Sequence, residues 1–166
     1  MEMERTKQLF TGMDRKDQLY FANVCGIAVF GLFLLFSFTV AGTDTALRVM
    51  VILTEIFGVM TLAAGVAGII YFTNERRWFS IAVVSFLSVW AIFAIGYEIG
   101  LGEPMGNYWL LFITYYITLI ASVVFIRLSY SRIDNVLKVV PAVFLFINAL
   151  LTLYMVFLNM WWGLTA

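Results

Sequence analysis

The chain has no histidine and only one cysteine, Cys25. A single cysteine excludes an intrachain disulfide bond and a C-x-x-C redox pair. The absence of histidine removes the commonest ligand of haem and catalytic zinc, and the side chain that most often acts as a general acid or base. We therefore expect no metal site, no cofactor and no catalytic residue in this chain.

Charged residues are also scarce. They make up 12% of the 166 residues, whereas soluble proteins have about 25%. Hydrophobic residues make up 63%, and a soluble fold of this length could not bury so much apolar surface. Lipid must then take the place of water around the chain. The formal net charge is zero, which gives no electrostatic attraction to nucleic acid, so we expect no nucleic-acid partner.

Five apolar runs are long enough to cross a bilayer. A spanning helix needs about 20 mostly apolar residues. The runs are continuous rather than alternating, which indicates helices and not the strands of a barrel. The sequence predicts an all-α polytopic integral membrane protein, a five-helix transmembrane bundle over residues 20–166, after a short cytoplasmic tail over 1–19. The predicted helices cover about 20–41, 47–73, 78–98, 107–128 and 138–162.

The basic residues predict the orientation in the membrane. Of the ten lysines and arginines, all except Arg48 lie before the first predicted helix, between the second and third, or at the facing ends of the fourth and fifth and in the connection between them. With five helices these three segments share one side, and the positive-inside rule makes that side cytoplasmic. The N-terminus is then cytoplasmic and the C-terminus outside, in a multi-pass protein of the cell membrane.

The second predicted helix carries a stripe of small residues. Side chains three or four residues apart share one face of a helix, and small side chains let two helix backbones approach closely. The stripe therefore predicts a helix-packing seam, which we favour over a ligand groove. The seam consists of Thr54, Gly58, Thr61, Gly65 and Gly68.

Polar residues in the last three predicted helices fall on shared faces, and polar groups in lipid need partners. They can form hydrogen bonds between helices, worth about 1 kcal/mol each, or they can line a path for a small solute. We favour hydrogen bonding and keep the polar lining as the alternative. The candidate residues are Ser85, Ser88, Tyr115, Thr118, Ser122, Asn148, Thr152 and Asn159.

Glu55 is the only ionisable carboxylate well inside a predicted span. An ionised carboxylate is costly in lipid, so Glu55 is a candidate for proton exchange or ion coupling. If the inner end of its helix lies near Tyr71, Glu55 is close to the outer headgroups. If the outer end lies near Ala46, Glu55 is nearer the midplane. The sequence leaves both positions open, together with a simple hydrogen bond to a neighbouring helix.

Three functions are compatible with these residues. No G-x-S-x-G, H-E-x-x-H, P-loop or dinucleotide-binding motif is present, so we expect no enzyme. The preferred hypothesis is a non-catalytic integral membrane subunit of a larger membrane complex or a self-assembly, whose partners are the lipid bilayer and other membrane subunits or copies of itself. The alternative is a small oligomeric transporter or channel with Glu55 as the coupling or selectivity residue. A lipid-binding protein or an intramembrane enzyme ranks third.

Overall fold

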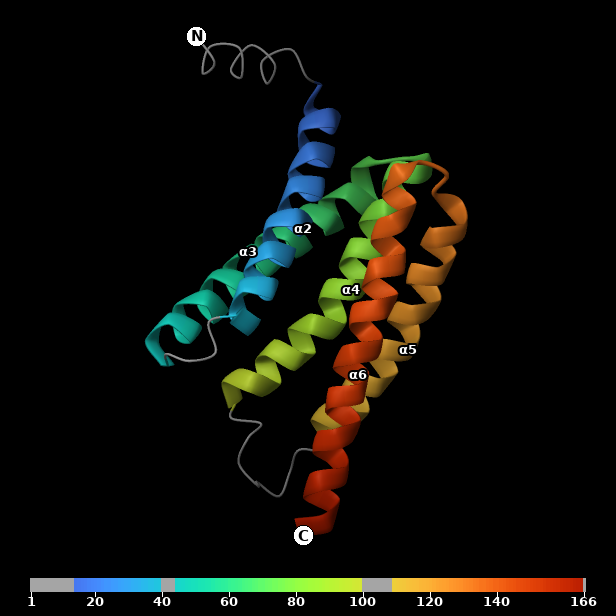
Figure 1. Cartoon of the computed structure of the whole chain (residues 1–166). Coiled ribbons are helices and arrows are strands. Elements are labelled where there is room, and N and C mark those ends of the chain that lie inside the picture. The colour runs from blue at the N-terminus through green and yellow to red at the C-terminus, as the bar shows by residue number, and fades with distance from the viewer. Residues whose placement is uncertain (1–13, 40–43, 100–108, 166) are drawn as a thin grey trace. The chain divides into compact units, whose positions relative to one another are not determined.

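The fold is almost entirely helical in the part of the chain that the computed structural model describes, residues 14–39, 44–99 and 109–165 (Figure 1). No strand occurs in these ranges. The prediction of an all-α fold with five long helices is confirmed. The helices are α2 (Arg15–Thr39), α3 (Asp44–Tyr71), α4 (Asn74–Ile99), α5 (Trp109–Arg132) and α6 (Val139–Thr165), with the short 3₁₀ helix η1 (Val136–Lys138) before α6.

All five helices are long and apolar enough to cross a membrane. Large apolar side chains are exposed along them, among them Leu35, Ile70 and Ile120 at 65%, 71% and 67%. Exposed apolar surface along whole helices is disfavoured in water and is what a lipid environment accommodates. The chain is therefore a multi-pass membrane protein whose outer surface contacts the bilayer.

Two helices begin several residues earlier than the sequence predicted. α2 begins at Arg15, so residues 15–19 are helical, whereas residues 1–13 lie outside the described residues. α4 begins at Asn74, which adopts a left-handed φ of 55° that asparagine tolerates better than most residues. Asp17 and Glu75 lie in the first turns of these helices, where a carboxylate interacts favourably with the helix dipole.

The described residues form two compact units, and the boundary between them lies inside α4, after Ser80. In the first unit, α2 and α3 run in opposite directions along one another (Figure 1). The ring of Phe33 stacks on that of Phe57 with 5.1 Å between the centroids. The five residues of the predicted seam are all buried: Thr54, Gly58, Thr61, Gly65 and Gly68.

Two glycines lie where the helices of the first unit pack closely together. A Cβ atom built on Gly26 would lie 2.7 Å from Thr61 Oγ1. A Cβ atom on Gly68 would overlap Ser80 Oγ and would lie 2.9 Å from the ring of Phe72. Neither position has room for a side chain, which is the reason that small residues are needed there.

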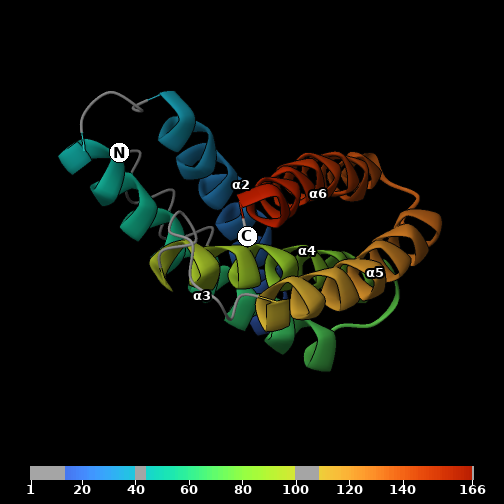
Figure 2. The same cartoon turned by 90° about the horizontal axis from the view of Figure 1, so that it is seen from below.

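The second unit consists of α4 from Ile81 onward, α5, η1 and α6, and in it α4 packs against both later helices (Figure 2). Val89 of α4 shares a buried cluster with Phe112, Tyr115 and Met155. Two aromatic pairs join α4 to α6. Phe86 stacks on Phe144 at 4.4 Å, and Phe93 meets Tyr154 edge-on at 5.7 Å.

Replacing Gly68 by alanine is expected to destabilise the protein by about 1–3 kcal/mol, because the added methyl group displaces Ser80 Oγ and the Phe72 ring. Circular dichroism of the detergent-solubilised protein during unfolding measures the change. Gly31→Ala is the matched control, since nothing beyond its own helix backbone lies within 4 Å of its Cβ position, and it should match the parent or exceed its stability by up to about 1 kcal/mol, because alanine favours a helix more than glycine does. Equal losses in both variants would contradict close packing at Gly68.

Candidate functional site

Glu55 lies on α3 at the edge of the seam, and its side chain is half-buried. The preceding residue, Thr54, is buried and donates a hydrogen bond of 2.7 Å to the carbonyl oxygen of Met50. This bond to its own helix satisfies the Thr54 hydroxyl. Glu55 therefore lies on a mostly apolar helix, next to the face of α3 that carries the seam.

The charged residues at one end of the first unit indicate how deep Glu55 lies in the membrane. Arg76 forms an ion pair with Asp17 there, and its guanidinium carbon lies 4.9 Å from the centroid of the Tyr20 ring. Tyr20 in turn meets Phe72 edge-on at 5.8 Å, so these charges lie at the Tyr71 end of α3. Such a cluster belongs at the level of the headgroups rather than in hydrocarbon.

Glu55 precedes Tyr71 by sixteen residues, which is about 24 Å of helix at 1.5 Å per residue. The hydrocarbon core of a bilayer is about 30 Å thick. An upright α3 would therefore place Glu55 toward the headgroups farther from Asp17 and Arg76, and a tilted α3 would bring it nearer the midplane. Of the two positions that the sequence leaves open, this geometry favours the one close to the headgroups at the far side.

Four of the predicted lining residues bond one another between α5 and α6. Asn148 Nδ2 donates to Ser122 Oγ at 3.2 Å. The hydroxyl oxygens of Tyr115 and Thr152 are 3.4 Å apart. Thr152 gives its own proton to the carbonyl oxygen of Asn148 at 2.6 Å, so Tyr115 is the donor in the bond to Thr152. The two pairs connect the same two helices at successive positions along their contact.

Tyr115, Ser122 and Asn148 lie on buried stripes with a seven-residue spacing, and the half-buried Thr152 lies beside the stripe of α6. In α5 the stripe contains Tyr115, Ser122 and Ser129, and in α6 it contains Asn148 and Met155. This spacing is typical of two helices that pack side by side with knobs-into-holes geometry. Tyr115, Asn148 and Ser122 are at most 2% exposed, so their polar groups face protein and not an aqueous path.

The other four predicted lining residues are not brought into these pairs. Ser88 Oγ donates to the carbonyl oxygen of Val84 in its own helix at 2.7 Å. Ser85 and Thr118 are half-buried, and Asn159 is exposed. Asn159 would fall on a stripe with a 3.6-residue period through Asn148. The packed stripe instead repeats every seven residues and leaves Asn159 beside it.

The sequence interpretation missed a polar pair in the first unit. Asn23 Nδ2 donates to Ser80 Oγ at 3.0 Å, and Ser80 Oγ donates to the carbonyl oxygen of Arg76 at 3.2 Å. Both side chains are fully buried. The sequence indicated half of this pair, because Asn23 is the one amide side chain in the first predicted helix and needs a hydrogen-bond partner in lipid. The partner could not be identified, because it lies 57 residues away in the sequence.

Three buried side-chain atoms find no hydrogen-bond partner among the described residues, namely Asn23 Oδ1, Thr61 Oγ1 and Asn148 Oδ1. Each asparagine therefore donates across its helix contact and leaves its oxygen unused. Amide and hydroxyl groups can donate and accept hydrogen bonds, but they do not ionise near neutral pH. The polar groups of both units are suited to joining helices rather than to acid–base chemistry.

The described residues contain no group of three or more histidine, cysteine, aspartate or glutamate side chains that could hold a metal ion. Comparison of the chain with family models, curated proteins and solved structures finds no match.

Proposed function

We propose that this chain is a non-catalytic integral membrane subunit, which assembles with other membrane proteins or with copies of itself. In the proposed orientation the N-terminus is cytoplasmic and the chain lies in the cell membrane. The uneven distribution of lysine and arginine supports that orientation.

The observation that carries the proposal is the pairing of the intramembrane polar groups. Asn148 with Ser122, and Tyr115 with Thr152, bond across the contact between α5 and α6, where Tyr115 is fully buried. A lining for ions or solutes needs polar groups that water can reach. Groups that bond one another inside a helix contact contribute instead to holding the helices together.

The large share of helix surface that is not buried within the chain also supports assembly. In α2, α3, α5 and α6 only 17% to 22% of the most apolar stretch is buried, whereas in α4 56% is. Four helices thus direct most of their surface away from the chain's own interior. Such faces can contact lipid or the helices of partner subunits, and a subunit without chemistry of its own acts through such contacts.

Native mass spectrometry of the protein, extracted from its own membrane with a mild detergent, tests this proposal. We expect the chain to leave the membrane in a fixed stoichiometry with other subunits or with copies of itself. A harsher detergent applied to the same membranes serves as the control, because it should release the single chain. A monomer carrying only lipid under the mild conditions would contradict the proposal.

A second candidate function, a small oligomeric transporter or channel, is favoured by one observation. Glu55 is a half-buried carboxylate within a helix that can span the membrane. Intramembrane carboxylates commonly mark ion or proton pathways, because their cost in lipid is otherwise hard to offset. In this candidate Glu55 is the coupling or selectivity residue.

The Glu55→Gln variant tests the second candidate, because it removes the charge and keeps the shape of the side chain. If Glu55 couples transport, ion or proton flux into liposomes should fall to the level of protein-free liposomes while the assembly stays intact. Glu98→Gln is the matched control, since Glu98 is an exposed carboxylate in the last turn of α4. Flux that is above the protein-free level and unchanged in Glu55→Gln would exclude Glu55 as the coupling residue, and a parent protein without such flux would exclude the transporter.

A further inference from the structure

The second unit carries an excess of positive charge where α5 ends and α6 begins. Arg127, Arg132 and Lys138 lie there, and Asp134 is the one carboxylate among them. Lys138 Nζ is 3.9 Å from a carboxylate oxygen of Asp134, whose side chain is 83% exposed. An exposed ion pair of this kind contributes little to stability and neutralises only part of the positive charge.

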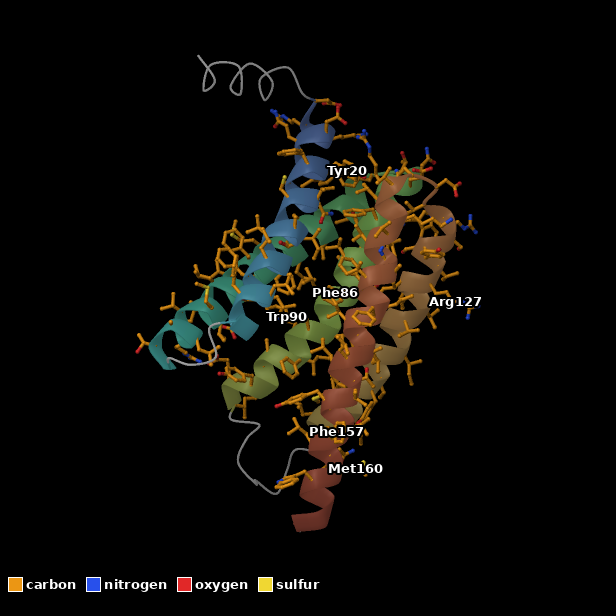
Figure 3. The ribbon with its side chains drawn as sticks, in the orientation of Figure 1. Tyr20, Phe86, Trp90, Arg127, Phe157 and Met160 are labelled. Atoms are coloured by element: carbon orange, nitrogen blue, oxygen red, sulfur yellow. The ribbon has the colours of Figure 1, made fainter. Side chains whose placement is uncertain are left out.

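Arg127 is the cation of this group that lies deepest along α5. It precedes the last residue of the helix by five residues, which is about 7.5 Å at 1.5 Å per residue. Its side chain is exposed and projects outward from α5 (Figure 3). It forms no ion pair and no hydrogen bond with any of the described residues. A guanidinium at the edge of the hydrocarbon needs a counter-charge, and in a bilayer the lipid phosphates provide one.

Tyr130 and Lys138 extend the site on the side of Arg127 that faces the headgroups. Tyr130 follows Arg127 by three residues, so the two share a face of α5, and it is 43% exposed. Lys138 Nζ lies 5.0 Å from the centroid of the Tyr130 ring, which holds this second cation close to the same face. Together the two cations and the phenol offer an anion both charge and a hydrogen-bond donor.

An exposed apolar stripe continues from Arg127 toward the middle of α5. Ile120, Val123 and Val124 lie seven, four and three residues before Arg127 and are 67%, 39% and 51% exposed. Residues at these spacings lie on the same face of the helix as Arg127. An acyl chain can lie along this stripe while the phosphate of the same molecule lies at Arg127.

We propose that Arg127, Tyr130 and Lys138 bind the headgroup of an anionic phospholipid. The phosphate meets the Arg127 guanidinium, the Tyr130 hydroxyl lies beside it, and Lys138 adds charge. A zwitterionic headgroup brings a cation of its own into this positive surface, so an anionic lipid binds more tightly. Inorganic phosphate lacks the acyl chains that contact Ile120, Val123 and Val124. The proposal requires only that the chain spans a membrane and is independent of the subunit function proposed above.

Titration of the purified full chain with phosphatidylglycerol in neutral detergent, read by native mass spectrometry, tests the site. The parent protein should bind phosphatidylglycerol more tightly than phosphatidylcholine. Arg127→Gln should weaken phosphatidylglycerol binding about fivefold, since a cation near anionic lipid contributes about 1 kcal/mol. Arg127→Lys should retain most of the binding, and excess inorganic phosphate should not displace the lipid.

Arg77→Gln is the matched control, because it removes the same charge from an exposed arginine in the first turn of α4. Its binding of phosphatidylglycerol should equal that of the parent. Circular dichroism of each variant confirms that the helices are intact, which an exposed substitution should leave unchanged. Equal losses in Arg77→Gln and Arg127→Gln, an unchanged affinity in Arg127→Gln, or equal binding of the two lipids would overturn the proposal.

Discussion

The inability of hydrocarbon to form hydrogen bonds is the constraint on which this structure depends. Helices satisfy the backbone groups internally, and polar side chains must find partners within the protein. Many hydroxyls are satisfied by their own helix. Ser37, Thr54, Ser88, Thr114 and Ser129 each donate to the carbonyl oxygen four residues earlier. Such residues need no neighbour, and their presence in a span therefore does not indicate a functional lining.

The two asparagines that face packed surfaces cannot be satisfied in this way. Asn23 bonds Ser80 in the first unit and Asn148 bonds Ser122 in the second, and both asparagines are buried. Each bond depends on the close approach of the helices concerned, because an asparagine that loses its serine leaves an amide unsatisfied in an apolar interior. Small residues such as Gly26 and Gly68 allow this approach in the first unit. Packing and hydrogen bonding thus support one another.

Much of the fold could be predicted from composition and spacing, because the five apolar runs and the stripe from Thr54 to Gly68 are local patterns. The hydrogen-bond partners of buried polar groups could not be predicted, since Asn23 and Ser80 are far apart in the sequence and meet only in the folded chain. Asn159 shows the limit of periodicity. A 3.6-residue period and a seven-residue repeat diverge over three turns, and the sequence does not say which one the contact follows. The helix ends were also missed, because charged residues such as Arg15 and Asp17 continue α2 beyond its apolar run.

The proposed subunit function requires that the polar groups between α5 and α6 are closed to water. Ser122→Cys in a Cys25→Ser background tests it most directly, because it places a single thiol on the buried stripe. We predict that a membrane-impermeant methanethiosulfonate reagent leaves this thiol unmodified in liposomes, while a thiol at the exposed residue Asn135 reacts readily. Rapid modification at residue 122 would show that water reaches the stripe, and would contradict a purely structural role for Ser122 and Asn148.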